Sequence, residues 1–228
     1  AQMPLRFIMD AVIKVTFPAY ARMQEHKKEL SQAIEKTLFF ITLLVFPMVT
    51  GLCLLARPLV AIIPRYSKWE IALLALYLYA INSLWGAVTT PLTNALTAIG
   101  KIKTVFKLMV MWTVLTWVFF PLLAVKFGFD GVAAASALVA TSSVVAIIIA
   151  KRYIKFRFIF SIIKPVVASL IMGVLLFLLI PTLARNILGI VVLTILGGVV
   201  YFGLIYLMVG QQFIIDAKKF IHAIKKKA

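Results

Sequence analysis

Three charged residues near the start of the chain have the types and the spacing of a binding surface for an anion. Arg6, Asp10 and Lys14 follow one another at intervals of four residues, so they share one face of a helix. The residues between them are mostly apolar, and charged groups in such segments usually face a bundle interior or a water-filled cavity. This charged strip is predicted to contact an anionic substrate group, with Asp10 holding the two cations in place. A structural ion-pair ladder at a helix end is the other interpretation.

An amide in the middle of an apolar run is the second candidate for substrate binding. Asn82 is followed by hydroxyl residues at Ser83, Thr89 and Thr90. A mid-span amide can contact a ligand, and it can equally hydrogen-bond a neighbouring helix. The sequence leaves both roles open for Asn82.

The chain lacks the residues that catalysis or metal binding would need. Glu70 and Asp130 are the acids expected on the outer connectors, and neither has a catalytic partner nearby in sequence. His26 and His222 stand alone, whereas a metal site needs several converging ligands. We therefore expect no catalytic residue, no metal, no cofactor and no enzymatic activity.

Long apolar runs are the elements that must position these groups. Hydrophobic residues make up 64% of the chain, and a soluble domain of this composition would expose far too much apolar surface. A membrane-spanning helix needs about 20 apolar residues, and unbroken runs of this length exclude the short alternating strands of a barrel. The sequence predicts an all-α, polytopic transmembrane helix bundle of about seven spans: a shorter one at 3–21, then 37–63, 71–99, 104–125, 130–150, 164–183 and 187–209.

The basic residues alternate in density from one connector to the next. Of 24 Lys and Arg residues, 19 fall in the segments 1–36, 101–107, 151–164 and 218–227, and the other five fall in the intervening connectors. Connectors rich in Lys and Arg remain in the cytoplasm. The chain is therefore predicted to be a multi-pass protein of the cell membrane with a cytoplasmic C-terminus. The net charge of +17 reflects this topology, and no nucleic acid is expected as a partner.

Four segments follow from this pattern. Residues 1–150 are predicted to form a helical lobe whose first helix is truncated, so that an N-terminal half is missing. Residues 151–163 form a basic cytoplasmic connector, 164–209 an additional transmembrane hairpin, and 210–228 a basic cytoplasmic tail. The hairpin has few polar residues and is expected to be peripheral. Residues 24–36 carry charges of both signs and are expected to form a short interfacial helix of their own.

Five short segments match, in order and spacing, the motifs of one transporter family. Residues 15–22 (Val-Thr-Phe-Pro-Ala-Tyr-Ala-Arg) resemble its "vlFPalsR" signature, and 46–52, with Phe46-Pro47-Met48 and Gly51-Leu52, resemble its "fP…GL". Residues 67–70 (Ser-Lys-Trp-Glu), 96–101 (Leu-Thr-Ala-Ile-Gly-Lys) and 128–133 (Gly-Phe-Asp-Gly-Val-Ala) resemble three of its turns. Over about residues 1–170 the chain thus resembles the polysaccharide-transporter branch of the MOP exporter superfamily.

The resemblance implies a fold and a function. Such proteins have two six-helix lobes around a cationic cavity, with two further helices in many members, and this chain would supply one lobe and the extra pair. It would belong to a flippase that moves a polyprenyl-pyrophosphate-linked oligosaccharide across the membrane by alternating access, for surface polysaccharide biosynthesis. The implied partners are this lipid-linked oligosaccharide, the bilayer, the missing N-terminal half, and polysaccharide polymerase and glycosyltransferases. The charged strip falls on a helix that lines the cavity in that family. This correspondence rests on the position of the helix in the chain and not on a shared residue motif.

Three alternatives stay open. A cation-coupled, MATE-like multidrug antiporter would need a compact intramembrane carboxylate site, and Asp10, flanked by cations that favour its ionised form, would have to supply it. A lipid II flippase of the same superfamily shares the mechanism. A membrane assembly scaffold would have the helices without a transport cavity.

Overall fold

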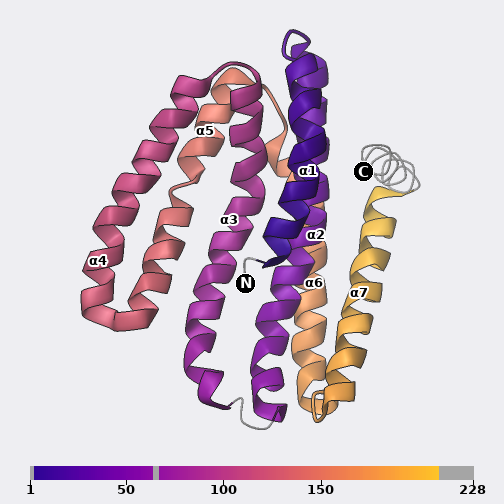
Figure 1. Ribbon diagram of the computed structural model, residues 1–228. Coiled ribbons are helices and arrows are strands. Elements are labelled where there is room, and N and C mark those ends of the chain that lie inside the picture. Colours follow the sequence, from indigo (N-terminus) through magenta and orange to yellow (C-terminus); the bar gives the residue numbers. More distant parts are fainter. Residues whose placement is uncertain (1–2, 64–66, 211–228) are drawn as a thin grey trace.

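The structure, a computed structural model, describes residues 3–63 and 67–210, without the side chains of residues 3–8, 10, 11 and 67. Within these ranges the chain forms helices joined by short connectors and no strand, as the sequence predicts (Figure 1). The helices are α1 (Met3–Arg22), α2 (Lys27–Ile62), the short 3-10 helix η1 (Ser67–Ala72), α3 (Leu73–Ala98), α4 (Ile102–Thr141), α5 (Val144–Tyr153), α6 (Phe158–Leu183) and α7 (Ile187–Val209).

Five stretches of the described chain are long and apolar enough to cross a membrane: Lys27–Ile62, Lys68–Ala98, Ile102–Tyr153, Phe158–Leu183 and Ile187–Val209. The third stretch folds back at Gly128, where φ is 57° and ψ is −133°, and its two arms run antiparallel (Figure 1). The six longer apolar runs of the sequence therefore correspond to six helical arms. The predicted transmembrane helix bundle is confirmed, and α1, which carries the charged strip, is not among the five stretches.

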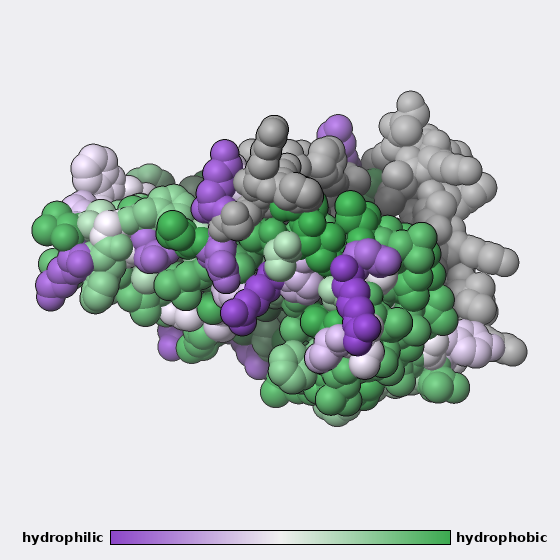
Figure 2. Space-filling view, turned by 90° about the horizontal axis from the view of Figure 1, so that it is seen from below, coloured by the Kyte–Doolittle hydropathy of each residue, from purple (hydrophilic) through white to green (hydrophobic). Residues whose placement is uncertain are grey.

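The connectors alternate between the two ends of the bundle. Residues 23–26, 99–101 and 154–157 lie at one end, at the top of Figure 1, and the end of α2, the start of η1 and residues 184–186 lie at the other. Within the described residues, the Lys- and Arg-rich connectors thus gather at the first end, which we call the basic end. Figure 2 shows the opposite end, where hydrophilic residues are scattered among hydrophobic ones.

Helix α2 is the centre of the bundle, and α1, α3, α6 and α7 all pack against it. The sequence expectation of a separate interfacial helix over residues 24–36 is wrong, because α2 is continuous from Lys27 to Ile62. Its buried residues recur every three or four positions from the first turns onward, which keeps them on one side of the helix. These residues are Leu30, Ile34, Leu38, Ile41, Val45 and Val49.

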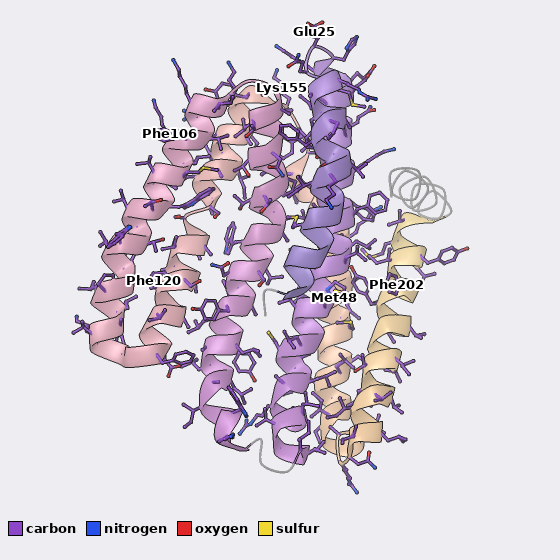
Figure 3. The ribbon with its side chains drawn as sticks, viewed as in Figure 1. Glu25, Met48, Phe106, Phe120, Lys155 and Phe202 are labelled. Atoms are coloured by element: carbon purple, nitrogen blue, oxygen red, sulfur yellow. The ribbon has the colours of Figure 1, made fainter. Side chains whose placement is uncertain are left out.

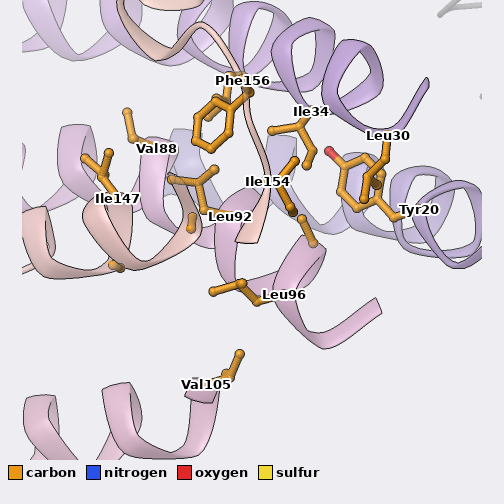
Figure 4. Close-up of a cluster of buried hydrophobic side chains, with 14 of the residues drawn as sticks. Tyr20, Leu30, Ile34, Val88, Leu92, Leu96, Val105, Ile147, Ile154 and Phe156 are labelled. Carbon is orange, nitrogen blue, oxygen red and sulfur yellow. The ribbon is translucent and has the colours of Figure 1, made fainter. Parts of the chain in front are cut away.

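A buried cluster at the basic end joins the helices that meet there (Figure 4). Tyr20 of α1, Leu30 and Ile34 of α2, and Leu92 and Leu96 of α3 are each at most 2% exposed. The connector after α5 adds two further members of the cluster, so it is packed into the bundle rather than lying loosely over it.

Proline breaks the hydrogen-bond ladder of α2 near its middle, and α7 repairs the break. Pro47 has no N–H, so the carbonyl of Leu43, four residues earlier, has no helical partner. The hydroxyl of Tyr201, which is fully buried, donates to this carbonyl at 2.8 Å. An unpaired carbonyl inside a membrane is costly. This single bond therefore ties α7 to the proline position of α2.

Two glycines allow the tight turns of α3 and α4. Gly100 has φ of 77° and follows the end of α3, where the N–H of Lys101 donates to the carbonyl of Leu96 at 2.9 Å, which closes the helix. At Gly131 a Cβ atom would lie 1.9 Å from the carbonyl oxygen of Leu123, so only glycine fits where the two arms of α4 meet.

Candidate functional site

Helix α1 positions the predicted charged strip. Its backbone carries Arg6, Asp10 and Lys14 within one continuous helix from Met3 to Arg22. The side chains of Arg6 and Asp10 lie outside the described residues, so their predicted contacts stay predictions. Lys14 is described, and its side chain is exposed.

The opposite face of α1 holds the helix in place. Met9, Val12, Thr16 and Tyr20 are buried, and α1 packs against α2 and α3. Lys14 is two positions from both Val12 and Thr16, about 200° around the helix, so it lies away from the packed face. The end of the strip thus lies on an open side of the lobe. Lys14 lines neither the groove between α2, α6 and α7 nor the two cavities at the basic end, and a concave partner for the strip remains a prediction.

Asn82 joins two helices. Its side-chain nitrogen donates to the hydroxyl of Ser136 at 2.8 Å and to the backbone carbonyl of the same residue at 3.3 Å. Ser136 belongs to the second arm of α4, and its neighbours Ala133, Ala135 and Ala137 are buried, so α3 and this arm approach closely. The observed contact is the interhelical role that the sequence left open. A substrate contact by Asn82 stays a prediction.

An apolar groove lies between α2, α6 and α7. Its volume is about 730 Å³, and Met48 and Phe202, labelled in Figure 3, line it from neighbouring helices near mid-height of the bundle. Met48 is 50% and Phe202 48% exposed, so the groove opens to the outside of the bundle. The lining is Leu43, Leu44, Pro47, Met48, Gly51, Leu52, Leu55, Ala56 and Leu59 of α2, Met172 and Leu176 of α6, and Ile190, Thr194, Gly197, Gly198, Tyr201 and Phe202 of α7.

The polar side chains of the groove are already satisfied by the protein. The hydroxyl of Thr194 donates to the carbonyl of Ile190 at 2.8 Å, and that of Tyr201 donates to Leu43. The groove is open beside two of its glycines, since a Cβ at Gly51 or Gly198 would meet nothing within 4 Å. The groove therefore offers an occupant mainly apolar contact, and the donors of these two hydroxyl groups are already engaged.

Sequence reasoning missed this groove because it treated the final hairpin as peripheral. The adjacent Gly197 and Gly198 in the middle of an apolar span were the available signal, since paired small residues at mid-span mark close approach or open space. The facing residues of α2 are more than 130 positions away, and no local pattern joins them.

Comparison with known proteins supports the same architecture. Residues 1–73 match the model of a family described as polysaccharide biosynthesis protein. A comparison with curated protein sequences gives no match. A solved structure titled "Lipid II flippase MurJ, inward closed conformation" superimposes on 91% of this chain, with a TM-score of 0.72 and 18% sequence identity.

The chain has a MurJ-like fold. It spans about half the length of that solved protein, 46% by alignment. The resemblance to polysaccharide transporters that the sequence motifs indicated is confirmed by the family match over residues 1–73 and by this fold. The chain is thus a multi-pass membrane protein whose fold is similar to that of this solved structure.

Proposed function

We propose that this chain is the C-terminal lobe, with two additional helices, of a flippase that translocates a polyprenyl-pyrophosphate-linked oligosaccharide across the cytoplasmic membrane. The apolar groove carries the proposal. It lies on helices long enough to span a membrane, opens outward, and has its polar side chains satisfied internally. A long hydrocarbon chain is the ligand that needs only such contact.

The charged strip supplies the complementary half of the proposal. A pyrophosphate headgroup is strongly anionic, and Arg and Lys are the side chains that bind such groups through charge-assisted hydrogen bonds. Lys14 is exposed on the side of α1 away from its packed face. Helix α2 packs against α1 and also against α6 and α7, so one helix links the helix that carries the strip to the helices that line the groove.

The basic end is assigned to the cytoplasm under this proposal. The Lys- and Arg-rich connectors meet there, and positive connectors remain on the cytoplasmic side. The lobe would rock against its partner lobe, so that the headgroup site faces first one side and then the other while the chain stays in the bilayer. No bond of the substrate is broken in such a step, and the protein acts as a transporter rather than an enzyme.

A lipid II flippase is the second candidate, favoured by the fold match to MurJ over 91% of this chain. The two candidates differ in the glycan and share the lipid pyrophosphate. Identifying the lipid-linked precursor that accumulates when the protein is depleted separates them.

The strip is tested by the double variant Arg6→Ala, Lys14→Ala in cells that need the protein for their surface polysaccharide. We expect surface polymer to be lost at normal protein levels, because the headgroup loses both cations. The matched control, Arg57→Ala with Lys68→Ala, removes two cations toward the opposite end and should keep normal polymer; Arg57 and Lys68 are both exposed. Normal polymer in the strip variant contradicts the role of the strip.

A further inference from the structure

A second cavity, distinct from the groove, lies at the basic end of the bundle. Its volume is about 1090 Å³. Its walls come from the connector before α2 and the first turns of α2, the turn between α3 and α4, and the end of α5 with the connector that follows it. Figure 3 marks this region with Lys155, near the top of the bundle.

Positive charge dominates the lining of this cationic cavity. Its lining contains six basic side chains and one acidic side chain, that of Glu35. One oxygen of the Glu35 carboxylate accepts a hydrogen bond from the backbone N–H of Arg157 at 2.6 Å. The single negative group is thus partly occupied by the backbone and cannot neutralise six cations. The basic residues are Lys27, Lys28, Lys101, Arg152, Lys155 and Arg157.

The cavity is held in shape by specific contacts. The hydroxyl of Ser31 donates to the backbone carbonyl of Lys155 at 2.6 Å, which ties the connector to α2. The ammonium of Lys101 lies 5.1 Å from the centre of the Tyr153 ring, a cation–π contact between the α3–α4 turn and the end of α5. Leu30 and Ile154, also in the lining, are buried in the core cluster. The basic side chains therefore lie next to buried, well-packed residues of the core cluster.

A smaller pocket of about 290 Å³ adjoins the cationic cavity and shares Glu35 and Arg157 with it. Lys164 lines this pocket and donates to the backbone carbonyl of Met208 at 2.9 Å, linking α6 to α7. Aromatic side chains lie in the same lining, and Phe160 is 74% exposed. Cations and exposed aromatic rings meet where helices leave the hydrocarbon, at the height of lipid headgroups.

We propose that the cationic cavity binds the anionic headgroup of a glycerophospholipid of the surrounding leaflet, with acyl chains along the exposed aromatic side of α6. Basic pockets between membrane helices attract anionic lipid headgroups through charge, and Arg adds paired hydrogen bonds to phosphate. A soluble phosphate would use the cations and leave the adjoining aromatic surface of Phe160 without a function. The bound lipid would hold α2, the α3–α4 turn and the α5–α6 connector together.

This inference does not depend on the proposed function. The cavity is lined by residues of the basic end, whereas the charged strip lies on α1 and the groove lies between α2, α6 and α7. A chain that transported nothing could still bind phospholipid here. Conversely, transport could proceed without it.

The test uses the full chain, purified in a neutral detergent, and the probe is phosphatidylglycerol counted by native mass spectrometry. The variant Lys101→Gln, Arg152→Gln, Lys155→Gln removes three lining cations. We expect phosphatidylglycerol affinity to fall on the order of a hundredfold, since each cation near an anionic lipid contributes roughly fivefold. The control variant Arg57→Gln, Lys68→Gln, Arg185→Gln removes three exposed cations from the rest of the chain, has the same net charge, and should change the affinity less than about threefold.

Two competing ligands distinguish a lipid phosphate from a soluble one. Inorganic pyrophosphate should displace the lipid poorly, and phosphatidylcholine should not compete. Equal loss of affinity in the two triple variants overturns the proposal, as does unchanged affinity in the cavity variant. Tighter binding of inorganic pyrophosphate than of phosphatidylglycerol also overturns it, because the ligand would then be a soluble anion. Selective binding of a polyprenyl pyrophosphate in place of phosphatidylglycerol overturns it by assigning the cavity to the transport substrate.

Discussion

The apolar groove and the cationic cavity share one helix and are built in opposite ways. The groove is lined by three long helices, α2, α6 and α7, and its polar side chains are satisfied internally. The cavity is lined by the first turns of α2, the end of α5 and three connectors, and its lining holds six cations and one carboxylate. Helix α2 supplies apolar residues to the first and Lys27 and Lys28 to the second.

The difference shows how one helix can serve two kinds of ligand group. Inside the bilayer, shape is the variable that the protein controls, because lipid tails are as apolar as the side chains. At the membrane surface, charge is the variable, because anionic headgroups concentrate there. We therefore expect the groove to respond to side-chain volume and the cavity to respond to charge and salt.

The largest expected effect comes from filling the groove. Gly198 lines the groove and has nothing within 4 Å of a Cβ position, so Gly198→Phe would place a ring in the open space without clashing at Cβ. We expect loss of surface polysaccharide, with phosphatidylglycerol binding at the cationic cavity unchanged. Polymer amount and lipid affinity are measured on the same variant.

Gly203→Phe is the matched control for this prediction. Gly203 is also in α7 and also has nothing within 4 Å of a Cβ position, but it does not line the groove. It should retain polymer. Equal loss in both variants would mean that a bulky residue anywhere on α7 disturbs the protein, and the groove would lose its assigned role.

The smallest expected effect comes from removing the hydrogen bond that links α7 to α2 beside Pro47. Tyr201→Phe removes the hydroxyl that donates to the Leu43 carbonyl at 2.8 Å, and we expect a loss of about 0.5–1.5 kcal/mol in the free energy of unfolding. In a Pro47→Ala background the residue at position 47 regains an N–H and can donate to the same carbonyl. The Tyr201→Phe change should then cost less. Detergent unfolding of the four proteins measures this coupling.

An equal cost of Tyr201→Phe in both backgrounds would contradict the account of the Pro47 break. Phosphatidylglycerol binding should be unchanged in all four proteins. A change in that binding would show that the groove and the cavity are coupled through α2.

Much of the fold could be predicted from the sequence, because long apolar runs and glycine turns are local signals. The six helical arms follow from run length, and the turns at Gly100 and Gly128 follow from glycine at the points where φ is positive. The gathering of basic connectors at one end followed from counting Lys and Arg. Each of these features depends on residues close together in the chain.

The parts that could not be predicted depend on contacts between distant segments. The charges of residues 24–36 suggested a separate helix, yet Leu30 and Ile34 are buried in the core cluster and extend α2 through that stretch. The hydroxyl of Ser31 donates to the backbone carbonyl of Lys155, which is 124 positions away. Helix α7 is apolar on all sides, so its sequence gives no periodic signal for the face that lines the groove.

The candidate site shows the same division. The charged strip was visible as a four-residue spacing, whereas the partner of Asn82 was not, because Ser136 is 54 positions away. The sequence could say that a mid-span amide needs a partner. It could not say that the second arm of α4 would supply one.

Photo-crosslinking with a polyprenyl-pyrophosphate-linked oligosaccharide, carrying a photoreactive group in its lipid chain, tests the central claim most directly. The labelled positions are mapped by mass spectrometry in the full chain. The account predicts labels within 43–59 of α2 and 190–202 of α7, which line the groove. Labels spread evenly over lipid-exposed residues of α4, such as Trp117 and Val125, would contradict it.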